Sequence, residues 1–319
     1  MNLVGAFFRL IRWPNLAFIA VTQCLFHFCV VKPSAYGGYY KFPLQLNTHL
    51  FVLLCFSSVI IAAAGYIIND YFDINIDLVN KPDKMVVDKI ISRRWALLLH
   101  LIFSVAGILV GFYVSYRLNN WLIGLANLGC VLLLWYYSTT YKRRLLIGNI
   151  LISALTAWVV LVLIVAELPG WWSGHLVTAV EKQTVARLSR IGVLYAAFAF
   201  VLTIIREAIK DMEDLEGDRK EGCRTMPIVW GINASKVFTA VWLIVIIVTI
   251  TVTQVYVIQF GWWWSASYIL IFVVVPLLLT FRKLYHAKQS AHFSYLSRLI
   301  KLVMLTGILS MVFFLWYTK

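Results

Sequence analysis

Two short windows of the sequence hold most of its carboxylates. Of 14 Asp and Glu residues, five lie in 70–88 and seven in 207–221, and only Glu167 and Glu181 lie elsewhere. Clustered carboxylate oxygens suit hard cations, and Mg²⁺ typically takes one or two carboxylates together with water and substrate phosphates. The two windows therefore indicate metal-assisted chemistry on a substrate that carries phosphate groups.

The spacing within each window predicts one helix face rich in carboxylates. The acids recur at i, i+3 and i+7 in the first window and at i, i+4, i+7 and i+11 in the second, so each set spans about 60° of a helix. The second face requires a helix that continues as far as Gly217. The residues are Asp70, Asp73 and Asp77, and then Glu207, Asp211, Asp214 and Asp218.

Composition indicates what holds these windows in place. Of the 319 residues, 62% are hydrophobic and 13% are charged, and the mean hydropathy is +0.84. Soluble proteins average about 45–50% apolar and about 25% charged residues, so the chain is predicted to be a polytopic membrane protein. The net charge of +14 does not indicate a nucleic-acid partner, because the Lys and Arg residues lie between apolar segments rather than on one basic surface.

Nine apolar runs are long enough to cross a bilayer, which predicts an all-α fold of nine transmembrane helices in a single domain over 1–319. The predicted spans are approximately 14–31, 49–68, 95–116, 120–140, 146–166, 191–206, 237–258, 264–281 and 299–317.

The loops predict the orientation of these spans. With nine spans, 21 of the 28 Lys and Arg residues fall on one side of the membrane and seven on the other. Cytoplasmic loops carry the excess of positive charge, so we expect a cytoplasmic N-terminus and an external C-terminus in the cell membrane. Trp171, Trp172 and 262–264 then lie at the outer surface, where aromatic rings favour the interface.

The same topology brings both acidic windows to the cytoplasmic side, each at the end of an even-numbered span. One Asp at the centre of a spanning helix costs about 2.5–3.5 kcal/mol, so six aspartates facing lipid are not plausible. We therefore expect both windows to face a wet, polar cavity and to share one site that attracts cations.

Together the windows resemble the two aspartate-rich motifs of the UbiA-type intramembrane prenyltransferases. The first reads Asn69-Asp70-x-x-Asp73-x-x-x-Asp77 and the second Lys210-Asp211-x-x-Asp214-x-x-x-Asp218. The nine-span pattern agrees with that superfamily, so the resemblance covers nearly the whole chain and implies a UbiA-like helical bundle.

Two further segments look most like the digeranylgeranylglyceryl phosphate synthase branch. They are Asn80-Lys81-Pro82 and the run REAIKDMEDLEGDRKEGCRTMPI over 206–228. After Pro82, relatives in that branch usually read Arg-Pro-x-Pro, whereas this chain reads Asp83-Lys84-Met85-Val86.

The resemblance implies transfer of a prenyl group, geranylgeranyl in that branch, from a prenyl diphosphate to a lipophilic acceptor. The acceptor would be the hydroxyl of a prenylglyceryl phosphate, which gives an ether lipid. Mg²⁺ is the implied cofactor, with Asp70, Asp73 and Asp77 holding one ion and Asp214 and Asp218, with Asp211, holding a second. These residues, Asp211 apart, are also the predicted catalytic set.

Cytoplasmic cations near the windows are candidates to bind the diphosphate, together with one amide side chain. They are Lys81, Lys142, Lys210 and Arg224, with Asn69. Lys142 follows Tyr137-Ser138-Thr139-Thr140-Tyr141 and precedes Gly148-Asn149, a context similar to the phosphate-contacting lysine of the family. A purely topological role for the Lys142-Arg143-Arg144 run stays open. For Arg206 and Glu207 we expect an internal ion pair, because two charged side chains at the end of a span need partners.

The remaining chemistry is less defined by the sequence. Tyr66, Tyr71, Tyr136 and Tyr137 are candidates to stabilise an allylic carbocation through their ring faces. The six histidines are scattered without ligand spacing, so a carboxylate or the leaving diphosphate would take the acceptor's proton. The five cysteines suit a packing role.

Two other functions remain open at this stage. An aromatic acceptor, as in quinone biosynthesis, would use the same aspartates. A cation transporter would also place aspartates in a membrane, although its carboxylates are expected near the midplane on broken helices rather than at helix ends.

Overall fold

The structure, a computed structural model, describes residues 2–36, 43–80, 85–168 and 179–317. Within these ranges the chain is helical almost throughout, and the extended pairing is limited to an isolated bridge between Val87 and Ile91. The predicted all-α fold is confirmed.

Nine helical stretches within the described ranges are long and apolar enough to span a membrane, which confirms the predicted number. They are Trp13–Ala35, Thr48–Phe72, Arg93–Arg117, Trp121–Thr139, Ile147–Glu167, Gln183–Glu213, Ile232–Ile258, Trp263–His286 and Ser290–Tyr317.

The chain divides into two compact units, and each is described by itself. The first comprises Met1–Lys142 and Trp158–Val193, and the second comprises Arg143–Ala157 and Leu194–Lys319. Two long helices, α8 (Ile147–Glu167) and α9 (Ala179–Glu213), contribute to both units. A single domain over 1–319 stays a prediction.

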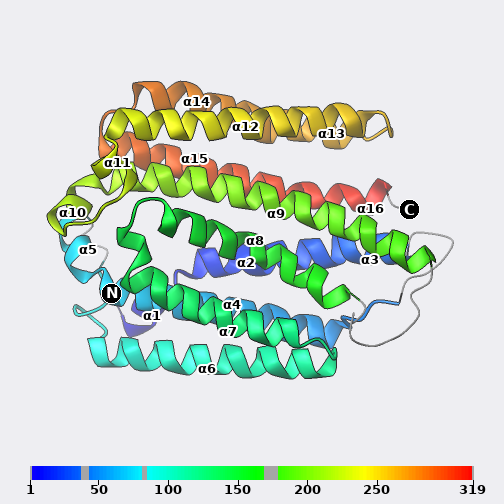
Figure 1. The fold of residues 1–319 in the computed structure, drawn as a ribbon, viewed down its shortest axis with the longest axis horizontal. Coiled ribbons are helices and arrows are strands. Elements are labelled where there is room, and N and C mark those ends of the chain that lie inside the picture. The colour runs from blue at the N-terminus through cyan, green and yellow to red at the C-terminus, as the bar shows by residue number, and fades with distance from the viewer. Residues whose placement is uncertain (1, 37–42, 81–84, 169–178, 318–319) are drawn as a thin grey trace. The chain divides into compact units, whose positions relative to one another are not determined.

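The first unit is built around α4 (Thr48–Phe72), which packs against α6 (Arg93–Arg117) and α7 (Trp121–Thr139). Figure 1 shows these three helices side by side. The first span consists of α2 (Trp13–Leu25), a π-helical turn over Phe26–Val31, and α3 (Lys32–Tyr36). Short helices α1 (Leu3–Leu10) and α5 (Ile74–Asn80) flank the ends of α2 and α4.

A chain of polar contacts inside the first unit holds α4, α6 and α7 together. Asn127 of α7 donates from Nδ2 to Oγ of Ser57 at 2.9 Å, and Ser57 donates to the carbonyl oxygen of Gly107 on α6 at 2.7 Å. Gly107 permits this approach, because a Cβ there would come within 2.5 Å of Cγ1 of Ile61. Small residues allow close helix contacts in membranes, where apolar burial offers little driving force.

The second unit packs α12 (Ile232–Ile258), α14 (Val275–His286) and α15 (Ser290–Leu309) with the later part of α9. α13 (Trp263–Ile269) and a π-helical turn over Leu270–Val274 precede α14. A 3₁₀ turn over Ser310–Phe313 and α16 (Phe314–Tyr317) follow α15. The core includes buried Leu202, Ile209, Leu243, Leu277 and Phe293.

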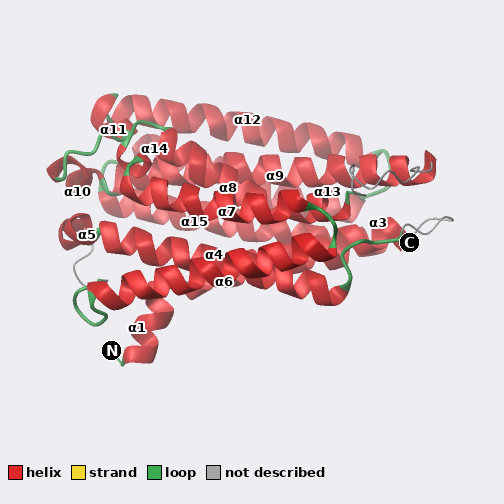
Figure 2. Ribbon diagram, turned by 60° about the horizontal axis from the view of Figure 1, so that its bottom comes forward, coloured by secondary structure: helices red, strands yellow, loops and turns green. Residues whose placement is uncertain are grey.

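Two short helices, α10 (Leu215–Lys220) and α11 (Met226–Val229), connect α9 to α12. Figure 2 shows them at the same end of the second unit. α10 carries Asp218, the last aspartate of the second window, and α11 follows that window, so the chain turns back immediately after these aspartates.

The expected unbroken acidic helix faces are not found. Long helix α4 ends at Phe72 and α5 begins at Ile74, so Asp73 lies at a break; α9 ends at Glu213 and α10 begins at Leu215, so Asp214 lies at a second break. Neither break contains Gly or Pro, which is why the helical spacing of the acids gave no sign of it.

Candidate active site

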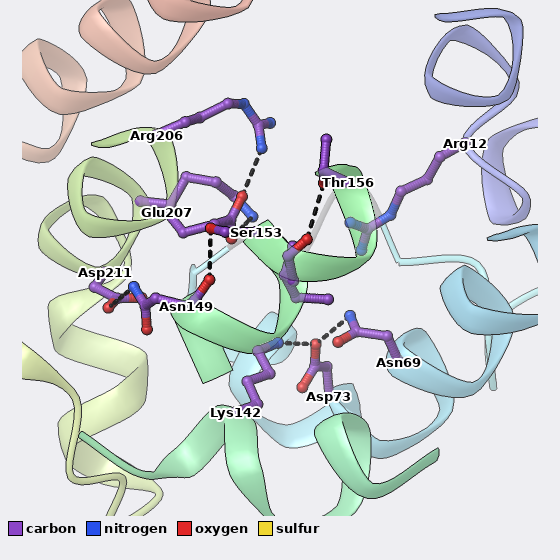
Figure 3. A network of polar contacts seen from close by, with 12 residues as sticks. Arg12, Asn69, Asp73, Lys142, Asn149, Ser153, Thr156, Arg206, Glu207 and Asp211 are labelled. Carbon is purple, nitrogen blue, oxygen red and sulfur yellow. Dashed lines mark hydrogen bonds and ion pairs between the residues drawn. The ribbon is translucent and has the colours of Figure 1, made fainter. Parts of the chain in front are cut away.

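Among the described carboxylates of the first window, Asp73 is the most enclosed. It is 5% exposed, and its Oδ2 accepts hydrogen bonds from Nδ2 of Asn69, at 2.6 Å, and from Nζ of Lys142. Figure 3 shows both side chains directed at Asp73 from α4 and from the segment after α7. Predicted site residues Asn69, Asp73 and Lys142 therefore lie in direct contact.

Asp70 forms an ion pair with Arg12, a residue that the sequence indicated only as one of the positive charges that orient the chain in the membrane. Nη2 of Arg12 lies 2.6 Å from Oδ1 of Asp70, and the guanidinium group lies 5.1 Å from the ring centroid of Tyr66. Arg12 has φ of 50° and ψ of 52°, a left-handed conformation that costs energy for a residue with a side chain of this size. A strained backbone conformation of this kind persists only where contacts with the surrounding structure hold the residue in it.

The third aspartate of the motif that begins at Asn69, Asp77, lies on α5. Burial, and then the like charges of Asp73 and Asp70, raise the pKa of Asp77 to about 6. Attraction to Asp70 raises the pKa of Arg12. Burial is the largest influence on Lys142 and acts to lower its pKa, but attraction to Asp73 and Tyr137 together with the hydrogen bond to Asp73 outweighs it and leaves that pKa raised. The first window is thus a partly buried cluster of carboxylates with two fixed cations.

The second window is organised around Asp211 and Asp218. Oδ2 of Asp211 accepts a hydrogen bond from Nδ2 of Asn149, the third residue of α8, at 2.9 Å. Asp218 is 6% exposed on α10. Asn149 and Asp211 both belong to the second unit, and Figure 3 shows their side chains facing each other.

The two windows have the same backbone pattern. The amide of Asp73 donates to the carbonyl of Asn69, and the amide of Asp77 donates to the carbonyl of Asp73, at 3.0 and 2.8 Å. At the equivalent positions, the amide of Asp214 donates to Lys210 and that of Asp218 donates to Asp214, at 2.8 and 3.2 Å. Each window therefore consists of the end of a long helix, an aspartate at the break, and a short helix. On both sides of the break a backbone amide donates to the carbonyl oxygen four residues earlier.

The predicted internal ion pair between Arg206 and Glu207 is confirmed. Nη1 of Arg206 lies 2.7 Å from Oε1 of Glu207, and Nζ of Lys210 lies 3.4 Å from its Oε2. Glu207 is therefore held between two cations of its own helix. Lys210, predicted to bind substrate, contacts this glutamate.

Two other predicted substrate residues are not part of these contacts. Arg224 is exposed after α10, where its backbone amide donates to the carbonyl oxygen of Arg143 at 2.8 Å. Lys81 lies outside the described residues.

Sequence reasoning missed Arg12 and Asn149 as site residues. Arg12 lies immediately before the first span, where a cation is expected for topological reasons alone. Asn149 was noted only as context for Lys142. The one available signal was a polar side chain at the start of an apolar span in each case.

The donor set fits Mg²⁺ as a partly hydrated ion. Among the described residues, no group of three or more His, Cys, Asp or Glu side chains is close enough to enclose a metal ion. Mg²⁺ does not require such a group, because it binds through one or two carboxylates and completes its octahedron with water and substrate phosphates. Asp70 and Asp73 each already hold a cationic group, so both positions attract positive charge.

Comparison with known proteins now identifies the chain. The sequence model of the UbiA prenyltransferase family matches residues 30–317. The chain belongs to this family. It is a membrane-embedded prenyltransferase, and its helices are those of an integral membrane protein.

Similar UbiA-family proteins include two named digeranylgeranylglyceryl phosphate synthase. The one from Methanothermobacter thermautotrophicus is 34% identical over 258 residues, which cover 80% of this chain and 82% of the relative. The one from Methanosphaera stadtmanae is 28% identical over 302 residues, covering 93% and 97% of the two chains.

Solved structures show the same fold. One described as a digeranylgeranylglyceryl phosphate synthase in membranes covers 98% of this chain and 99% of its own, with a TM-score of 0.59 and 20% identity. A UbiA homolog from Archaeoglobus fulgidus, bound to GPP and Mg²⁺, covers 96% and 99%, with a TM-score of 0.55 and 17% identity. At these identities the likeness concerns the fold.

Proposed function

We propose that this UbiA-family enzyme transfers a geranylgeranyl group from its diphosphate to the hydroxyl of a prenylglyceryl phosphate, forming an ether lipid. The observation that carries the reaction type is the pair of aspartate windows with one shared backbone pattern. The relatives named digeranylgeranylglyceryl phosphate synthase, which match most of the chain, support the acceptor.

Each window is proposed to bind one Mg²⁺, and both ions to serve one diphosphate. One or two of the carboxylates of Asp70, Asp73 and Asp77 would hold the first ion, and one or two of those of Asp211, Asp214 and Asp218 would hold the second. When bound, Mg²⁺ neutralises the charge that develops on the departing diphosphate. Both windows follow even-numbered spans, so nine-span topology supports a common cytoplasmic side.

The chain's own cations are proposed to bind the diphosphate oxygens directly. Lys142 and Arg12 are already placed at the first window by Asp73 and Asp70. The raised pKa of Lys142 keeps it charged at neutral pH, so it is a hydrogen-bond donor for a phosphate oxygen. Lys210, Arg224 and Lys81 remain further candidates, and Asn69 acts here by orienting Asp73.

The reaction breaks the allylic C–O bond, and both electrons of that bond leave with the diphosphate. The acceptor hydroxyl then attacks the allylic carbon, and its proton passes to the diphosphate or to a carboxylate of the windows. The face of Tyr66 is occupied by Arg12, which leaves Tyr71, Tyr136 and Tyr137 as candidates to stabilise the carbocation.

An acceptor competition tests this proposal. Membranes carrying the protein receive geranylgeranyl diphosphate with geranylgeranylglyceryl phosphate and hydroxylated aromatic compounds together, and the products are identified by mass. We expect the diether phosphate. An aromatic product alone would contradict the proposed acceptor while leaving prenyl transfer intact.

A further inference from the structure

The N-terminal helix α1 has a large exposed apolar face. Leu3, Val4 and Phe8 are 67%, 63% and 48% exposed. At about 100° per residue, Val4 and Phe8 lie about 40° apart on the helix circumference, and Leu3 is exposed at the first residue of the helix. The helix ends before the first membrane span, so its exposed face is not explained by the nine spans.

The exposure does not come from a detached helix, because another face of α1 is fully buried. Ala6 and Leu10 are 0% exposed and pack in a cluster with Val86, Val87 and Ile91 of the segment before α6. The ring of Phe7 also lies 6.3 Å from that of Phe103, edge to face. α1 is therefore fixed on the first unit and carries its apolar face outward.

The position of α1 places that face at the membrane surface. Only Ile11 and Arg12 separate it from Trp13, where the first span begins, and two residues of extended chain reach at most about 7 Å. Figure 2 shows α1 running across the direction of α4 and α6 rather than alongside them. A helix that crosses the spanning helices at their ends lies closer to the plane of the bilayer than to its normal.

The surroundings of α1 have the composition of a membrane interface. Trp13 and Trp95, at the starts of the first and third spans, are 56% and 62% exposed. Tryptophan favours the headgroup level. Arg9 on α1 and Arg94 in the first turn of α6 are exposed cations on the same side of the membrane.

We propose that α1 is an interfacial helix that binds a lipid surface carrying anionic headgroups. Leu3, Val4 and Phe8 enter the boundary between headgroups and acyl chains, and Arg9 and Arg94 bind the anionic groups. Amphipathic helices bind in this way, through buried apolar area together with attraction to anionic lipid. The proposal concerns membrane attachment and is independent of which acceptor the enzyme uses.

Depth measurements on the full chain in nanodiscs test the apolar contact. In a variant whose five cysteines are replaced by alanine, Val4→Cys, Phe8→Cys and Arg9→Cys each carry an environment-sensitive fluorophore. We expect lipids brominated in the acyl chains to quench positions 4 and 8 several-fold more than position 9, and iodide in water to show the opposite order.

Either of two results would overturn the apolar contact. Strong iodide quenching at positions 4 and 8 would place the face in water. Protection from both quenchers would show that protein, such as a second copy of the chain, covers it. Unchanged thermal unfolding of the labelled proteins would establish that each variant retains its fold.

Amide hydrogen exchange over 3–10 tests the anionic preference. Each cation near an anionic surface contributes about fivefold in binding, so exchange should slow measurably when anionic lipid replaces part of a zwitterionic bilayer. The Arg9→Gln/Arg94→Gln variant should lose this dependence. Arg117→Gln, at the opposite end of α6, is the matched control and should keep it. Equal exchange in both lipids would contradict the proposed partner.

Discussion

Asp73 and Asp214 have almost the same backbone conformation, with φ and ψ of −90° and 3° at Asp73 and −94° and 10° at Asp214. This region of φ and ψ is sparsely populated and often contains active-site residues. In both windows the aspartate marks the change from a long helix to a short one. The shared geometry supports equivalent roles for two segments that are about 140 residues apart.

Lys142 provides the first test. Comparing it with the adjacent cation distinguishes a specific contact of Lys142 from the general positive charge of its loop. Lys142→Gln should lower kcat/KM for the prenyl diphosphate by about 10- to 100-fold, the cost of losing one or two charged hydrogen bonds. Steady-state kinetics at saturating Mg²⁺ would measure it. Arg143→Gln removes the same charge from the adjacent exposed residue and should have little effect. Equal losses of kcat/KM in both variants would show that Lys142 contributes only to the positive charge that orients the chain in the membrane.

Asn149 should matter to the second window through its contact with Asp211. Asn149→Asp places a second carboxylate where an amide now donates, so we expect the Mg²⁺ concentration for half-maximal activity to change by at least about tenfold. Mg²⁺ titrations of the purified variant would show it. Ser153→Ala, which removes a hydroxyl that donates to the carbonyl of Asn149, is the control and should leave the titration nearly unchanged.

The contact of Arg12 with Asp70 should be measurable as a coupling energy. In a double-mutant cycle of Arg12→Gln and Asp70→Asn, we expect about 1 kcal/mol of coupling in the free energy of unfolding, since the side chains are 35% and 19% exposed. Denaturant unfolding in detergent would give the four values. Additive effects of the two substitutions would show that the contact contributes nothing to stability.

Close helix packing in the first unit predicts different outcomes for two glycines. A Cβ at Gly111 of α6 would collide with the amide group of Asn127, whereas one at Gly129 of α7 would meet no atom within 4 Å. Gly111→Ala should therefore destabilise the protein by about 1–3 kcal/mol, and Gly129→Ala should be neutral or slightly stabilising. Thermal unfolding of the two variants checks this, and equal melting temperatures would contradict the packing of α6 on α7.

The number of spans was predictable because the bilayer imposes long apolar runs, but their ends were not. The sixth span was predicted over 191–206, whereas α9 runs from Ala179 to Glu213. Hydropathy falls where Arg206, Glu207 and Lys210 begin, yet the helix continues because these side chains pair with one another. A hydropathy pattern does not register that pairing.

The site was predictable in its residue types and not in its contacts. The spacing of the aspartates identified both windows, and the expected Arg206–Glu207 pair followed from neighbours in sequence. The cationic partners of Asp73 and Asp70 are 69 and 58 residues away, so only the folded chain brings Lys142 and Arg12 to them. A cation next to a membrane span is expected in any membrane protein, because such charges set its orientation. The sequence therefore gave no separate sign that Arg12 contacts Asp70.

The most direct test of the account is diphosphate release by matched variants of the two windows. Purified protein should release diphosphate from a radiolabelled prenyl diphosphate only with Mg²⁺ and acceptor, and removal of Mg²⁺ with a chelator should stop it. Asp73→Ala and Asp214→Ala should each abolish release, while Asp88→Ala, which removes an exposed acid paired with Arg93, should retain it. Normal release by either window variant, or release without a divalent ion, would contradict the proposal that both windows serve one metal-bound diphosphate.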